Sequence, residues 1–214
     1  VRGIAPWSGP SLGGTVVTIA GSRLGEAPVA ISCRFGRQVP SHAASGHGSD
    51  GVRCVSPSAL PTGWSSVELS MHGTTLRSGG SLYVHAALHA SELVPPAGPV
   101  AGGTRVTVLG AGFRESATVR CRFEGSSATA AARRVDSGRL ECASPPSSSA
   151  GARLLGLSAN GQQFVVSSAA FTYRPAAAVS SVWPLSGASG GGTPLSVLGS
   201  GFSSAAEALG ALRC

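Results

Sequence analysis

Apolar and polar residues alternate in short stretches that recur along the chain. Val17 and Ile19 follow a Gly-Gly-Thr sequence, and Val106 and Val108 follow a second copy of it. Alternation with a period of two predicts a half-buried strand whose apolar side faces a core. The same pattern predicts further strands at residues 31–35, 52–54, 67–71 and 83–85, and again at residues 119–123, 140–142, 155–159 and 171–173.

The chain repeats itself at a fixed period. Thr15, Thr104 and Thr193 each end a Gly-Gly-Thr sequence and are spaced 89 residues apart. Such a repeat predicts tandem copies of one structural unit. We expect two complete units, at residues 1–88 and 89–177, and the beginning of a third at 178–214, so that the chain is a piece of a longer array. Connections of about a dozen residues, 86–96 and 174–184, are expected between the units.

Short strands separated by turns at intervals of about 8–12 residues are typical of a β-sandwich. The predicted fold class is therefore all-β, with tandem immunoglobulin-like sandwiches, two of them complete and one truncated. Asn160-Gly161 between two such strands predicts a tight type I′ hairpin. No apolar run approaches the roughly 20 residues that a membrane-spanning helix needs.

The cysteines follow the repeat. Cys33 and Cys54 lie 21 residues apart, as do Cys121 and Cys142, and the alternation turns all four inward. One disulfide in each unit is the favoured interpretation, and it indicates an oxidising compartment. The alternative is two buried free cysteines per unit. Cys214 falls where the first cysteine of the third unit belongs, so its partner is expected beyond the end of this chain.

Several motifs together resemble the IPT/TIG domain, an immunoglobulin-like module of plexins, Rel-type transcription factors and tandem surface proteins. They are Pro-x-x-Gly-Pro-x-x-Gly-Gly-Thr, Cys-Arg-Phe, Cys-x-Ser-Pro and a final Phe-x-Tyr. The matching residues of the two units are Pro6, Gly9, Gly13, Gly14, Thr15, Cys33, Phe35, Cys54, Ser56 and Pro57, and Pro95, Gly98, Gly102, Gly103, Thr104, Cys121, Phe123, Cys142, Ser144 and Pro145. The first unit departs from this pattern at Tyr83-x-His85, which is matched with Phe171-x-Tyr173 of the second.

The net charge of +7 comes entirely from arginine, because the 16 basic residues include no lysine. A surface that binds nucleic acid normally mixes the two residue types. We therefore favour a GC-rich coding sequence, as in some green algae, over a polyanion-binding face as the cause. If polyanions are bound, we expect the contact residues to lie at outward positions that share one sheet face. The candidates are Arg120, Arg122, Arg133, Arg134 and Arg139.

No motif with catalytic or metal-binding chemistry stands in its required context. Gly46-x-Gly48-x-x-Gly51 fits the dinucleotide fingerprint as a string but lacks the flanking strand and helix. Gly9-x-Ser11-x-Gly13 fits a nucleophile elbow, but the second unit has Val100 at the serine position. The histidines and carboxylates show neither zinc nor calcium spacing. We therefore expect no enzyme activity, cofactor, metal or small-molecule substrate.

The function predicted from these features is a non-catalytic extracellular array for structure and adhesion. Its expected partners are other domains of the same long chain and protein or acidic-polysaccharide surfaces, with a cell surface, ciliary surface or cell wall as its setting. Sugars linked to the Pro- and Ser-rich segments are a further hypothesis. The alternative is an intracellular DNA-binding module of the Rel type, for which the excess of arginine is the main argument.

Overall fold

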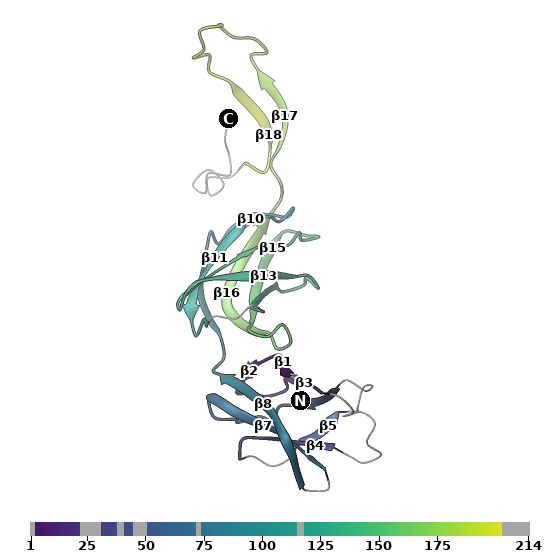
Figure 1. Cartoon of the computed structure of the whole chain (residues 1–214). Coiled ribbons are helices and arrows are strands. Elements are labelled where there is room, and N and C mark those ends of the chain that lie inside the picture. Colours follow the sequence, from purple (N-terminus) through teal and green to yellow (C-terminus); the bar gives the residue numbers. More distant parts are fainter. Residues whose placement is uncertain are drawn as a thin grey trace.

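The computed structural model describes residues 3–21, 31–37, 41–44, 51–71, 74–114 and 118–202, and every regular element in these ranges is a strand (Figure 1). The units lie one after another in a row, from the purple N-terminal end to the yellow C-terminal end. The first unit contains β1 (Gly3–Ala5), β2 (Ser8–Pro10), β3 (Val16–Ala20), β4 (Ile31–Phe35), β5 (Ser41–Ala44), β6 (Gly51–Val55), β7 (Gly63–Met71) and β8 (Thr74–His85). The second contains β9 (His89–Val94), β10 (Ala97–Pro99), β11 (Arg105–Ala111), β12 (Arg120–Phe123), β13 (Thr129–Asp136), β14 (Arg139–Ala143), β15 (Gly151–Ser158) and β16 (Val165–Arg174), and is followed by β17 (Ala178–Trp183) and β18 (Ser196–Ser200).

Each of the first two units is a sandwich of two facing sheets. In the first unit, β1, β3 and β6 form one sheet and β4, β7, β8 and β2 the other, while β5 pairs with strands of both. The second unit repeats this arrangement, with β13 as the strand shared between its sheets. The predicted class of tandem immunoglobulin-like sandwiches is thus confirmed.

The alternating apolar residues form the core between the sheets. Val17, Ile19, Val106 and Val108 are all fully buried, as the sequence pattern predicts. The second unit also packs three rings edge to face, with centroid separations of 5.0–6.1 Å. These rings belong to Phe123, Phe171 and Tyr173.

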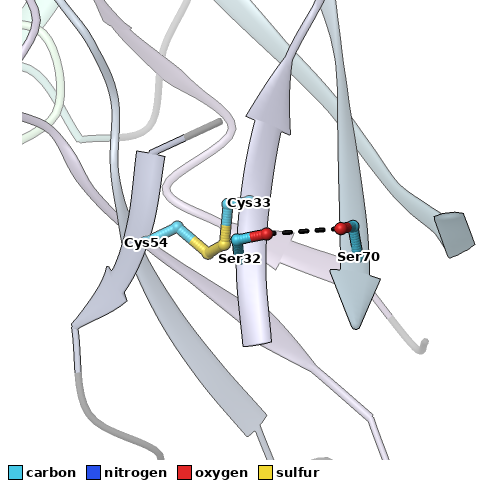
Figure 2. The surroundings of a disulfide bond; sticks show 4 residues. All are labelled: Ser32, Cys33, Cys54 and Ser70. Carbon is cyan, nitrogen blue, oxygen red and sulfur yellow. Dashed lines mark hydrogen bonds between the residues drawn. A yellow bond between two sulfur atoms is a disulfide. The ribbon is translucent and has the colours of Figure 1, made fainter. Parts of the chain in front are cut away.

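A disulfide joins the two sheets of each sandwich. Cys33 on β4 is bonded to Cys54 on β6, and the Cα atoms lie 6.2 Å apart. Figure 2 shows Cys33 pointing toward this partner while its neighbour Ser32 points the other way, toward Ser70 on β7. Cys121 and Cys142 are bonded in the same way, with a Cα separation of 6.5 Å. Both separations lie within the usual range for disulfides of about 4.4–6.8 Å. Cys214 lies outside the described residues.

The Gly-Gly-Thr and Cys-x-Ser-Pro motifs of each unit pack together and are joined by hydrogen bonds. The Thr15 N–H donates to Ser56 Oγ at 3.0 Å, and the Ser56 N–H donates to the Thr15 carbonyl at 2.8 Å. Thr104 and Ser144 exchange the same two bonds at 3.1 and 2.8 Å. Gly13 has a φ of +77°, and a side chain there would overlap the backbone of Pro57. This close approach explains why the two motifs recur together.

The last strand of the first unit has a different register from the one that the sequence motif predicts. Leu82 and Val84 are the buried residues of β8, whereas Tyr83 is only half-buried. Tyr83 pairs with Ser8 as Thr172 pairs with Ala97, which makes Tyr83 the counterpart of Thr172 and not of Phe171. Matching Tyr83-x-His85 with Phe171-x-Tyr173 was therefore wrong by one residue, a slip that exchanges the two faces of a strand.

The predicted type I′ hairpin at Asn160-Gly161 is also wrong. A type I′ turn needs positive φ at both central residues, and Gly161 has it while Asn160 does not. The connection between β15 and β16 instead runs from residue 159 to 164, and Asn160 Oδ1 accepts hydrogen bonds from the backbone N–H groups of Gln162 and Gln163.

The connections between units are shorter than the dozen residues expected, because β9 and β17 begin early. Residues 86–88 separate β8 from β9, and residues 175–177 separate β16 from β17. In the third unit β17 pairs with β18, where Val182 lies opposite Val197. Val197 is 38% exposed, whereas its counterpart Val108 is fully buried. The described part of this unit offers no second sheet to cover it. The unit boundaries at 88 and 177 stay predictions.

We expect Val106→Asp to unfold the second unit, because an unpaired carboxylate in the sandwich core costs several kcal/mol. Arg105→Asp, one residue away on the exposed face of β11, should leave the fold intact. Urea unfolding followed by near-UV circular dichroism measures both variants. Equal losses of stability at the two positions would contradict the assignment of the faces.

Candidate functional site at the junction of the first two units

The first two units are held against each other at their junction. Only residues 86–88 link them, and Leu88 is buried in the core of the second unit. Figure 1 shows the green loop between β15 and β16 reaching toward the first unit near β1 and β3. This loop and the linker bring the outer end of the first sandwich against the second.

The loop satisfies an open backbone edge on the first unit. Strand β1 pairs with β3 only from Thr18 to Ala20, so the preceding residues of β3 lack a strand partner on that side. The side-chain amide of Gln162 fills this gap at Val16: its Oε1 accepts from the Val16 N–H at 2.8 Å, and its Nε2 donates to the Val16 carbonyl at 2.9 Å. Gln163 Nε2 donates to the Gly14 carbonyl at 2.7 Å. The two glutamines thus replace a pairing strand.

Asn160 anchors the same loop. It is buried, and its Nδ2 lies 3.2 Å from both the Ser8 carbonyl and Thr15 Oγ1 of the first unit. Thr15 Oγ1 also donates to Gln163 Oε1 at 3.0 Å. Because a buried polar group left without a partner is costly, this network favours one relative placement of the two units. We call residues 160–163 and their partners the amide clamp.

A cluster of aromatic side chains lies beside the amide clamp, on the outer face of the first unit. The Trp7 and Trp64 rings are stacked, with centroids 6.2 Å apart and an interplanar angle of 28°. Trp64 also contacts Tyr83 edge to face at 5.2 Å. Three neighbouring segments supply these rings, because Trp64 lies opposite Tyr83 across β7 and β8, and the Tyr83 N–H donates to the Trp7 carbonyl.

A cavity of about 280 Å³ opens between this aromatic cluster and the second unit. We call it the junction cavity. The first unit contributes Trp7, Trp64, Tyr83 and His85 to its wall, and the second contributes Phe113 and Arg114 among others. The Arg114 guanidinium lies 5.0 Å above the Tyr83 ring, a cation–π contact between the units. None of the described residues that line the cavity is acidic.

His85 closes one side of the junction cavity. Its Nδ1 donates to the Ala86 carbonyl at 2.8 Å. The other ring nitrogen, Nε2, is buried and has no hydrogen-bond partner.

The five arginines predicted to contact polyanions do not form one face. Arg120 and Arg122 lie on β12 in one sheet, and Arg139 lies on β14 in the other, with Arg133 and Arg134 on the shared strand β13. Their expected grouping on a single sheet face is a misreading of the topology, because β13 turns the chain from one sheet to the other.

Several of these arginines already have protein partners. Arg133 pairs with Glu141 at 2.7 Å, and Arg139 pairs with Asp136 at 2.7 Å. A hydrogen bond from the Gly138 N–H, with a second from Arg139, lowers the pKa of the Asp136 carboxyl below its usual value, so this partner stays charged. The Arg122 guanidinium lies 4.2 Å above the Phe164 ring.

No arrangement typical of metal binding appears in the described residues. They contain no cluster of three or more His, Cys, Asp and Glu side chains that could hold a metal ion. The same part of the chain forms no helix with the length and apolarity needed to cross a bilayer. The junction cavity and the amide clamp are therefore the candidate functional features of this part of the chain.

Sequence reasoning missed the junction. None of Trp7, Trp64, Arg114 and residues 160–163 was singled out as a contact between units. The 89-residue spacing of the Gly-Gly-Thr motifs, applied to Tyr83, would have made it the counterpart of Thr172 and so placed it on the outer face. No pattern in the sequence links Gln162 to Val16, because the two residues lie 146 positions apart.

Each of the two complete units matches a known protein family. The family model described as IPT/TIG domain matches residues 1–85 and 89–173. A search of curated proteins found no match.

Among solved structures, the extracellular region of plexin A4, domains 1 to 10, is 23% identical with a TM-score of 0.61 and covers 92% of this chain. A second plexin A4 structure, domains 1 to 8, is 23% identical with a TM-score of 0.53 and covers 79%. This chain spans only 17% of either plexin chain, and at this identity the likeness shows the fold alone. Invasin, a bacterial integrin-binding protein, is more distant, with 11% identity, a TM-score of 0.32 and coverage of 84% of this chain and 40% of its own.

We expect the double variant Gln162→Ala/Gln163→Ala to loosen the junction without unfolding either unit. It removes the partners of the Val16 N–H and of the Val16 and Gly14 carbonyls, each worth about 0.5–1.5 kcal/mol. Hydrogen exchange at the Val16 amide should accelerate by an order of magnitude or more, and small-angle scattering should show a wider range of inter-unit angles. Val166→Ala, an exposed position on β16 of the same hairpin, is the control. Unchanged exchange at Val16 in the double variant would disprove the amide clamp.

Proposed function

The chain belongs to the IPT/TIG family, and on that premise we propose that it is a segment of a non-catalytic extracellular array with structural and adhesive roles. The observation that carries the proposal is the amide clamp. A three-residue linker combined with specific hydrogen bonds between units makes a stiff joint. A series of such joints produces a rod that holds binding surfaces away from the place where it is anchored.

The extracellular assignment is supported by the disulfides. A disulfide between the two sheets in both complete units is typical of proteins folded in an oxidising compartment. The fold also resembles that of a plexin extracellular region. We place the array at a cell surface, and a ciliary surface or a cell wall are the specific settings to test.

The surfaces of the array are the proposed sites of binding. Protein and acidic-polysaccharide partners suit a chain with a net charge of +7. Attraction of polyanions by Arg120, Arg122, Arg133, Arg134 and Arg139 is proposed to be weak, because the set is divided between two sheets and two members are neutralised by carboxylates. Such contacts are strongly reduced by salt.

We expect peptide mapping under non-reducing conditions to recover Cys33 linked to Cys54 and Cys121 linked to Cys142, with no bond between units. The mapping is done on chain isolated from its natural source, because the compartment decides the outcome. Reduction should cost each unit about 3 kcal/mol of stability, as loops of this length predict in the chain-entropy model. Free thiols at all four positions would place the protein in a reducing compartment and overturn the extracellular proposal.

Selection from random DNA duplexes distinguishes the array from the Rel-type alternative. An extracellular array should show no enriched sequence at physiological salt, and any attraction at low salt should be independent of sequence. A DNA reader would discriminate by about 1–3 kcal/mol for each mismatched base pair. Enrichment of one sequence with nanomolar binding would favour the intracellular alternative.

A further inference from the structure

We propose that the junction cavity binds a uronate residue of an acidic polysaccharide. In this arrangement the indole rings of Trp7 and Trp64 pack on the apolar face of the sugar, and Arg114 pairs with its carboxylate. The inference goes beyond the array function and does not depend on it, since a rod can bear such a site or lack one.

The aromatic cluster is not needed by the fold. The second unit has the same strands, yet the positions equivalent to Trp64 and Tyr83 are Ala152 and Thr172, which lie opposite each other in the same way. Trp64 is 68% exposed and Trp7 is 41% exposed, so neither ring stabilises a core. Large apolar side chains gathered at the surface beside a cavity are typical of a binding site.

The volume of the junction cavity suits a ligand as small as a single sugar ring. At about 280 Å³ it lies just below the range of about 300–1,000 Å³ that is usual for sites of drug-sized ligands. The indole rings of Trp7 and Trp64 are stacked with an interplanar angle of 28°, and both line the cavity. A pyranose has one face of C–H groups that packs on such rings and a rim of hydroxyl groups that remains free for polar contacts.

The charge of the cavity selects an anionic ligand. The guanidinium carbon of Arg114 lies over the Tyr83 ring, 5.0 Å from its centroid, and Arg114 lines the cavity. Its N–H groups are the proposed contacts of the ligand. The N–H edge is the part of arginine that binds a carboxylate through two parallel hydrogen bonds. A quaternary ammonium, the usual ligand of aromatic cages, would be repelled because Arg114 already supplies a cation.

A hexuronate combines an apolar face with a carboxylate. Each has a complementary group in the wall of the junction cavity: the indole rings for the apolar face and Arg114 for the carboxylate.

Isothermal titration of the whole chain with trigalacturonate tests the proposal. We expect binding that is at least tenfold weaker in Trp64→Ala and in Arg114→Gln. Two variants serve as matched controls and should bind like the original chain: Trp183→Ala, because Trp183 is a 71% exposed tryptophan on β17, and Arg105→Gln, because Arg105 is an exposed arginine that lies outside the cavity and outside the set proposed to attract polyanions. Galactotriose, the neutral counterpart, should bind at least tenfold more weakly than trigalacturonate.

Each other outcome overturns the proposal. Absence of trigalacturonate binding excludes the site, and equal binding of galactotriose excludes the role of Arg114. An equal loss in Arg105→Gln and Arg114→Gln, or equal binding of a sulfated trisaccharide by all variants, would indicate general attraction by the net positive charge. Thermal melts confirm that each variant is folded. Failure here leaves the array proposal standing, because cysteine mapping and duplex selection test that proposal separately.

Discussion

The junction depends on the backbone groups of β3 that have no strand beside them. Strand β1 stops pairing before it reaches Val16, so the N–H and carbonyl of Val16 have no strand partner on that side. Gln162 provides both through one side-chain amide, and its neighbour Gln163 reaches the Gly14 carbonyl. Satisfying this edge fixes where the second unit sits, and the linker and the cavity are arranged around that position.

The two complete units share a framework but differ in the residues at their junction. The framework is nearly the same in both, with a disulfide and paired Gly-Gly-Thr and Ser-Pro segments in each. The residues that face the junction are not repeated: Tyr83 has a threonine as its counterpart, and Trp64 has an alanine. Residues that the framework does not require are free to supply function, and in this chain they are gathered at the junction of the first two units.

The arginine excess shows why composition is a poor guide to a binding surface. A net charge of +7 says nothing about where the charges lie. Arg133 and Arg139 face carboxylates, whereas Arg114 stacks on an aromatic ring across the junction. Exposed ion pairs contribute little to stability, but they neutralise the charge that a distant polyanion would meet. Arg114 has the same charge as the other arginines, but its neighbours differ: it lies over an aromatic ring beside the cavity, whereas Arg133 and Arg139 pair with carboxylates.

The sequence by itself determined five strands of each complete unit, the repeat, the family and the facing cysteines, because alternation and spacing are local properties of the chain. It did not predict β1, β2 and β5 or their counterparts β9, β10 and β13. Sequence patterns did not predict how strands pair with each other or how the two units pack. The register of β8 was misjudged by one residue, since Tyr83 and Leu82 are both apolar enough to face a core, and only pairing with β2 decides between them. The contact of Gln162 with Val16, and the cavity that it positions, arise from the packing of two folded units. Such contacts join residues far apart in the chain and leave no periodic signal, so only the tertiary structure could reveal them.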